Sequence, residues 1–291
     1  MTTNLNWNPK KIYKESVQWL DNPENQEFIK TDLNNLERYL RGKLPITYVP
    51  VATMFLATVH MAEAVTKLWD DDPEGIDHFY YSLNYNMCEM LYHQIYLRLV
   101  PANQEKSYLH LNATGLWLAD AIPLGNAVAI ESLGSCLLGG FQSKWFHPLE
   151  IKDTRVAPFI LALYTQAYQR PFPEDLRVTD LYTRLLRCWQ SEDEAELTQA
   201  LLAACDFHLE CSRRESRART YEFGDWEYAI HPVELLALYR LREMRGLSIP
   251  VINHSLMHTP MGRLYPVKVL PQNPLLEKVT AKLLLTATNM E

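Results

Sequence analysis

The segment DWEYAIHPVELLALYRLREMRG, residues 225–246, decides the fold that we expect for this chain. Pro232 suits the first turn of a helix, where the N–H that proline lacks would have no partner. Leu235 and Leu238 follow the three-residue spacing of a buried helical face. Gly246 can close the helix in the left-handed conformation. The segment therefore predicts a core helix that begins after Pro232 and ends before Gly246.

Three arginines, Arg240, Arg242 and Arg245, fall in the last turns of this helix, where the negative end of the helix dipole favours cations. The chain then continues as LSIPVINHSLMHTPMGRLYP, residues 247–266, which prolines interrupt repeatedly. We expect this segment to be an ordered loop that lies across neighbouring helices.

Helical signals recur along the chain, and no run of residues shows strand alternation flanked by hairpin turns. Asn22 and Pro23 predict a capped helix start, and Ser191 with Glu194 has the spacing of a capping box. Helices are expected over residues 10–20, 23–40, 51–69, 72–99, 104–119, 123–140, 156–168, 176–189, 191–213, 233–245 and 273–286. We predict an all-α fold of roughly ten helices in antiparallel, loosely repetitive hairpins. The chain would form one domain, residues 1–291, with possible halves at 1–170 and 171–291.

Composition limits the classes of function. A chain of 291 residues that is 47% hydrophobic can bury a large core, and its net charge of -7 argues against general nucleic-acid binding. The five cysteines are scattered and include no CxxC pair, as is typical of reduced thiols in the cytoplasm.

We expect no membrane segment. The start of the chain lacks the apolar core of a signal peptide. The most apolar region, residues 115–141, is interrupted by Asp120, Pro123 and Glu131, so it predicts a buried helical hairpin.

Few residues have the pattern of a catalytic or metal site. His254 and His258 have the spacing of two metal ligands on a helix, but prolines bracket them and no HExxH glutamate lies between them. Hydrogen-bonding loop histidines explain the pair better. Gly134-Ser135-Cys136 lacks the pattern of a nucleophile elbow, and no phosphate-binding glycine motif occurs. The sequence therefore predicts no catalytic residue, no cofactor and no metal.

Two acidic clusters, Asp70-Asp71-Asp72 and Glu192-Asp193-Glu194, are predicted at helix junctions. One carboxylate suffices to cap each helix, so we interpret the remaining charge as a candidate docking surface for a basic partner. A basic run, Arg213, Arg214, Arg217 and Arg219, is interleaved with glutamates. Local ion pairs explain this run better than phosphate binding does.

The sequences HPVELLAL (231–238), REMRGL (242–247) and NHSLM (253–257), together with the helical layout and length, carry a resemblance. They resemble cytoplasmic immunity proteins of bacterial polymorphic-toxin systems, of the immunity protein 49 type. The resemblance covers the last quarter of the chain, and the rest matches in helix pattern only. It implies neutralisation of a cognate toxin by tight binding. It transfers no binding residues, because immunity families place specificity on variable surfaces.

Three functions remain open. The first is a non-enzymatic immunity protein that occludes a toxin domain, with an acidic surface suited to a basic partner. The second is an all-α metal-dependent hydrolase or transferase that uses His254 and His258. The third is a helical scaffold for other proteins of the cell. The sequence does not indicate the oligomeric state.

Overall fold

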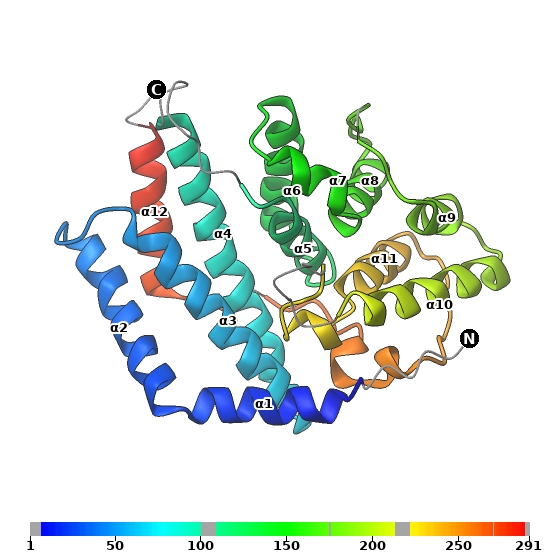
Figure 1. Ribbon diagram of the computed structural model, residues 1–291, viewed down its shortest axis with the longest axis horizontal. Helices are drawn as coiled ribbons and strands as arrows, with labels where there is room; N and C mark the ends of the chain where they lie inside the picture. Colours follow the sequence, from blue (N-terminus) through cyan, green and yellow to red (C-terminus); the bar gives the residue numbers. More distant parts are fainter. Residues whose placement is uncertain (1–6, 100–108, 175, 213–221, 270, 289–291) are drawn as a thin grey trace. The chain divides into compact units, whose positions relative to one another are not determined.

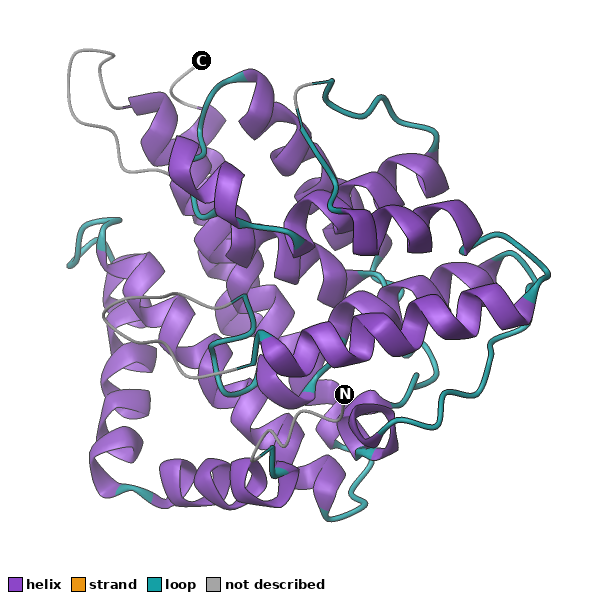
Figure 2. Ribbon diagram, turned by 45° about the vertical axis from the view of Figure 1, so that its right-hand side comes forward, coloured by secondary structure: helices purple, strands orange, loops and turns teal. Residues whose placement is uncertain are grey.

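The computed structural model describes residues 7–99, 109–174, 176–212, 222–269 and 271–288 (Figure 1). Within these residues the chain forms twelve α-helices and three short 3-10 helices and contains no strand (Figure 2). The all-α prediction is therefore confirmed.

Packing divides the chain into two compact units. Unit 1 comprises Met1–Tyr13 and His110–Lys268, and unit 2 comprises Lys14–Leu109 and Val269–Glu291. This division does not follow the halves 1–170 and 171–291 that the sequence suggested. The last helix, α12 (Pro274–Thr288), packs with α2 (Pro23–Leu40) and α4 (Gly75–Leu99), so the C-terminal end of the chain belongs with early helices.

Unit 2 is built around the hairpin of α3 (Tyr48–Trp69) and α4. The second half of α1 (Pro9–Asp21) also belongs to this unit. The core of unit 2 is apolar and includes the buried side chains Leu36, Val49, Leu56, Val279 and Leu283. Asn22 caps α2 by accepting a hydrogen bond from Glu24 N, as predicted.

Helix α3 is the one helix, among the described residues, that is long and apolar enough to cross a membrane by length and composition. Within its most apolar window, 56% of the residues are buried inside the structure. Core helices of soluble proteins pass the same test, so this helix alone is weak support for a membrane span.

Unit 1 is arranged around α5, which contacts α6, α7, α8 and α11. Its helices are α5 (Leu111–Ala121), α6 (Ala127–Gln142), α7 (Pro148–Asp153), α8 (Val156–Tyr168), α9 (Asp180–Cys188), α10 (Glu194–Glu210) and α11 (Val233–Met244). The contact between α5 and α6 confirms the buried hairpin expected over residues 115–141.

Helix α11 is buried on all its faces, whereas the spacing of its leucines predicted one buried face. All ten residues from Val233 to Arg242 are buried, including the polar Glu234, Arg240 and Arg242. Gly246 takes a φ of +69°, which confirms the left-handed helix end. The helix is thus a central core element of unit 1.

The loop after α11 packs back onto this helix. Tyr239 donates its hydroxyl hydrogen bond to Pro250 O at 3.2 Å, and Arg240 donates to Tyr265 O. The arginines therefore do more than complement the helix dipole. Arg242 donates from Nε to Ser248 O at 2.7 Å and from Nη1 to Ser191 O at 3.0 Å, so it fixes two connecting segments.

Several predicted boundaries were wrong because a nearby side chain caps the helix better. Asn126, rather than Pro123, precedes α6 and accepts a hydrogen bond from Ala129 N. Asp193, rather than Ser191, caps α10 and accepts from Ala195 N and Glu196 N. The short helix α7 lies between the predicted helices 123–140 and 156–168, where no helix was predicted.

Candidate functional site

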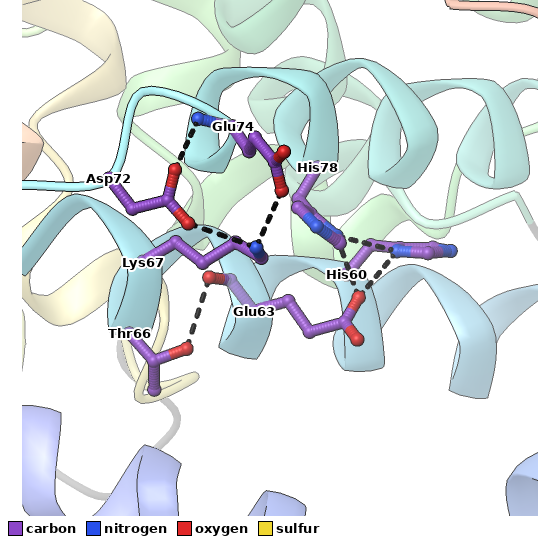
Figure 3. A network of polar contacts seen from close by, with 7 residues as sticks. All are labelled: His60, Glu63, Thr66, Lys67, Asp72, Glu74 and His78. Carbon is purple, nitrogen blue, oxygen red and sulfur yellow. Dashed lines mark hydrogen bonds and ion pairs between the residues drawn. The ribbon is translucent and has the colours of Figure 1, made fainter. Parts of the chain in front are cut away.

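One group of metal-ligating side chains converges in unit 2, between α3 and α4 (Figure 3). His60 and Glu63 are three residues apart on α3, so both side chains lie on one helical face. His78 lies in the first turn of α4, which packs against α3. Elsewhere in the described ranges, no three His, Cys, Asp or Glu ligand atoms come this close together.

The three ligand atoms almost touch. Glu63 Oε2 lies 2.8 Å from His60 Nδ1 and 2.6 Å from His78 Nδ1. The two Nδ1 atoms are 3.1 Å apart. The side chains of His60, Glu63 and His78 are 20%, 32% and 16% exposed, so the cluster is shielded but open to small solutes.

The two imidazoles determine the charge of Glu63. Burial alone would raise the pKa of this carboxyl group. Hydrogen bonds from His60 and His78, with the charges of both rings, outweigh burial and lower the pKa of Glu63 to about 2. Glu63 is therefore ionised at neutral pH, as a metal-binding carboxylate must be.

Aromatic rings of α4 hold the histidines in place. The His60 ring lies 5.5 Å from the Tyr85 ring, nearly parallel to it, and 5.1 Å from the Tyr81 ring. His78 meets Tyr81 edge-on at 5.9 Å. Asn273, which directly precedes α12, donates its side-chain amide hydrogen bond to Tyr85 Oη at 3.4 Å. The ring orientations at the cluster are thus supported by packing.

Lys67 closes the turn next to this cluster (Figure 3). Its Nζ donates to Glu74 Oε2 at 2.9 Å and to Asp72 Oδ2 at 3.0 Å. Asp72 Oδ1 also accepts from Glu74 N at 2.9 Å. The hydrogen bonds from Glu74 N and Lys67 lower the pKa of Asp72, so this carboxylate is ionised and stabilises the turn.

The predicted docking residues are found at helix junctions. Asp70 and Asp71 are exposed in the α3–α4 turn, whereas Asp72 is half-buried and bound by Lys67. Glu192, Asp193 and Glu194 are all exposed at the start of α10, with Asp193 used as the cap. In each cluster one carboxylate, that of Asp72 or Asp193, accepts backbone hydrogen bonds at a helix start.

The predicted alternative metal pair does not assemble into a three-ligand site. His254 directly precedes the 3-10 helix η2 (Ser255–His258), and His258 is the last residue of this helix. His254 Nδ1 accepts a hydrogen bond from Leu256 N at 3.2 Å, and His254 Nε2 lies 3.5 Å from Asp206 Oδ1. In the described residues this pair gains no third ligand, and His254 caps η2 instead.

The segment that carries the family resemblance lies in a buried polar network. Tyr228 donates its hydroxyl hydrogen bond to Asp120 Oδ2 at 2.8 Å, and His231 Nε2 lies 3.1 Å from Asp120 Oδ1. Asp120, Tyr228 and His231 are all buried. These residues join α5 to the segment before α11, which is a structural role.

The other sequence candidates also have structural roles or lie outside the described residues. A Cβ atom at Gly134 would lie 2.3 Å from the Tyr164 ring, so glycine at this position permits close helix packing. Ser135 donates to Glu131 at 3.3 Å, and the five cysteines are buried and form no disulfide. The basic run Arg213, Arg214, Arg217 and Arg219 lies outside the described residues.

Sequence reasoning missed the His60–Glu63–His78 cluster. The pair His60 and Glu63 gives a weak HxxE signal, but many surface helices contain such a pair. His78 follows Glu63 by 15 residues, across a turn, so its approach depends on how α4 packs against α3.

Comparison of the chain with protein-family models, with curated proteins and with solved structures found no match.

Proposed function

We propose that this chain is an immunity protein that neutralises a cognate antibacterial toxin domain by direct binding and occlusion in the cytoplasm. The resemblance of residues 231–257 to the immunity protein 49 type is the starting point. In the structure, much of this segment is buried: α11 lies in the core of unit 1, and the following loop covers it. The shared residues therefore maintain the fold, and recognition falls to the surface.

The docking proposal rests on acidic charge that is exposed and clustered at two helix junctions. Asp70 and Asp71 lie beside Asp72, whose carboxylate binds Glu74 N. Glu192 and Glu194 lie beside Asp193, which caps α10. Like charges that lie close together on an exposed surface repel one another, so the clustering itself does not stabilise the fold. They raise the association rate with a basic partner and make this rate dependent on salt.

The test is association with the toxin domain encoded beside this chain's gene. One variant carries Asp70→Asn and Asp71→Asn, and a second carries Glu192→Gln and Glu194→Gln. Asn is suited to position 71, where φ is +58°. Asp72 and Asp193 stay unchanged, so both helix starts keep their hydrogen bonds.

We expect the variant of the docking cluster to associate about tenfold more slowly at low salt, with a flatter dependence on ionic strength. The matched control is Glu24→Gln with Glu27→Gln on α2, which removes two exposed negative charges elsewhere in the chain. If both cluster variants bind like the control at every salt concentration, neither cluster docks the toxin. If the parent neither binds the toxin domain nor protects cells from it, the immunity function itself is excluded.

A further inference from the structure

We propose that His60, Glu63 and His78 bind one divalent transition-metal ion, with zinc as the ion that this donor set favours. This proposal goes beyond the immunity function and does not depend on it. It replaces, for this cluster, the expectation that the chain holds no metal.

The geometry of the cluster fits one ion held by all three side chains. Tetrahedral zinc, with bonds of ~2.1 Å, places its ligand atoms roughly 3.4 Å apart. The measured separations are 2.6, 2.8 and 3.1 Å. An ion therefore requires the three separations to grow by roughly 0.3 to 0.8 Å, which partly exposed side chains can do by small rotations.

The donor atoms determine which ion fits. Two imidazole nitrogens and one carboxylate oxygen suit zinc and its neighbours in the first transition row. Calcium and magnesium prefer oxygen ligands, so two nitrogens select against them. Three protein ligands leave the fourth tetrahedral position to water. The partial exposure of Glu63 gives solvent access to this position.

Without an ion, the same contact can be made by hydrogen bonds alone. Both Nδ1 atoms would then carry protons directed at the single oxygen Glu63 Oε2, with the two nitrogens 3.1 Å apart. This arrangement crowds two N–H groups on one oxygen. A metal ion would replace both protons and bind the same three atoms. Metal titration therefore distinguishes the two arrangements.

The support around the cluster suits a metal site. Tyr81 and Tyr85 fix the imidazole planes, and the α3–α4 turn is closed by Lys67 with Asp72 and Glu74. His60 and Glu63 come from α3 and His78 from α4, so an ion would link the two helices of the hairpin (Figure 3).

The experiment is a titration of the full chain, stripped with a chelator and dialysed, with Co²⁺ and with Zn²⁺. We expect one ion per chain by calorimetry, and visible Co²⁺ absorption typical of four-coordinate nitrogen and oxygen ligation. Zn²⁺ should also raise the thermal midpoint of the parent, because it binds the folded state only. A thiolate-to-metal charge-transfer band would place the ion at a cysteine and overturn the proposal.

Three variants, His60→Ala, Glu63→Gln and His78→Ala, should each lose stoichiometric binding and the Zn²⁺-dependent rise in thermal midpoint. The control variant, His254→Ala with His258→Ala, removes the other histidine pair and should bind like the parent. Circular dichroism checks that each variant keeps its helical content; Glu63→Gln, which preserves side-chain volume, serves if an alanine variant unfolds. The proposal fails if the parent binds no ion, if the three variants bind like the parent, or if the control loses binding.

Discussion

His208 and Glu234 form a fully buried pair, with His208 Nδ1 2.9 Å from Glu234 Oε1. His208 Nε2 lies 2.9 Å from the carbonyl oxygen of Tyr228, which can only accept a hydrogen bond. Nε2 therefore carries a proton. A further proton must lie between Nδ1 and the carboxyl group of Glu234. The pair links α10 to α11 inside the core of unit 1.

This pairing predicts that Glu234→Ala and Glu234→Gln differ in stability. Alanine leaves a cavity and an unpartnered Nδ1, so we expect a loss of roughly 3–5 kcal/mol in the free energy of unfolding. Glutamine can donate an amide hydrogen to the Nδ1 lone pair of a neutral ring, so its loss should be below about 1.5 kcal/mol. Urea denaturation of both variants measures the difference. Equal losses would show that His208 does not depend on this hydrogen bond.

Arg242 provides a second prediction, because it is a fully buried cation that donates to backbone carbonyls. It contacts Trp189 O and Ser191 O before α10 and Ser248 O after α11. Arg242→Met keeps an unbranched aliphatic stem but removes the guanidinium group. The carbonyl oxygens then lose their hydrogen-bond donor. We expect a loss of roughly 2–4 kcal/mol, from unmade buried hydrogen bonds.

The control for this change is Arg245→Met, three residues further on. Arg245 is exposed, stacks on the Trp189 ring at 4.7 Å and donates to Gln190 at 2.8 Å. Its replacement should cost less than about 1 kcal/mol. Urea midpoints with an unchanged slope give the comparison. Similar shifts for the two variants would contradict the structural role assigned to Arg242.

Local signals in the sequence predicted the helix ends well where only one nearby residue could cap the helix. Asn22 before Pro23, and Gly246 after α11, were read correctly because few other residues nearby could take these positions. The starts of α6 and α10 were misplaced because two residues competed for the cap. In both cases a side chain closer to the apolar run, Asn126 or Asp193, makes the hydrogen bonds.

Tertiary packing decides the features that the sequence could not indicate. Periodicity marked Leu235 and Leu238 as core residues but gave no sign that Glu234 and Arg242 of the same helix are also buried. Their partners lie 26 and about 50 residues away. His78 reaches Glu63 only because α4 folds back along α3. Such pairs follow from the register between helices, which no local pattern encodes.

The last prediction concerns Glu227, which is buried just before α11. Burial, with the nearby charge of Asp225, raises the pKa of Glu227 from 4.5 to about 8. The folded chain therefore holds a proton here that the unfolded chain releases at neutral pH. Stability from this group is fully present below about pH 4.5 and is lost as the pH rises through about 8. Glu227→Gln keeps the neutral shape at every pH, so it should remove this loss.

We expect the free energy of unfolding of Glu227→Gln, relative to the parent, to increase between pH 5 and pH 8 by up to ~1.4 kcal/mol per pH unit. Urea titrations at unit steps of pH measure this difference. Glu222, whose pKa burial raises to about 7, gives a similar slope in both proteins and cancels. The exposed Glu174→Gln is the control and should follow the parent at every pH. A constant difference between Glu227→Gln and the parent over this range would mean that Glu227 is already ionised in the folded chain.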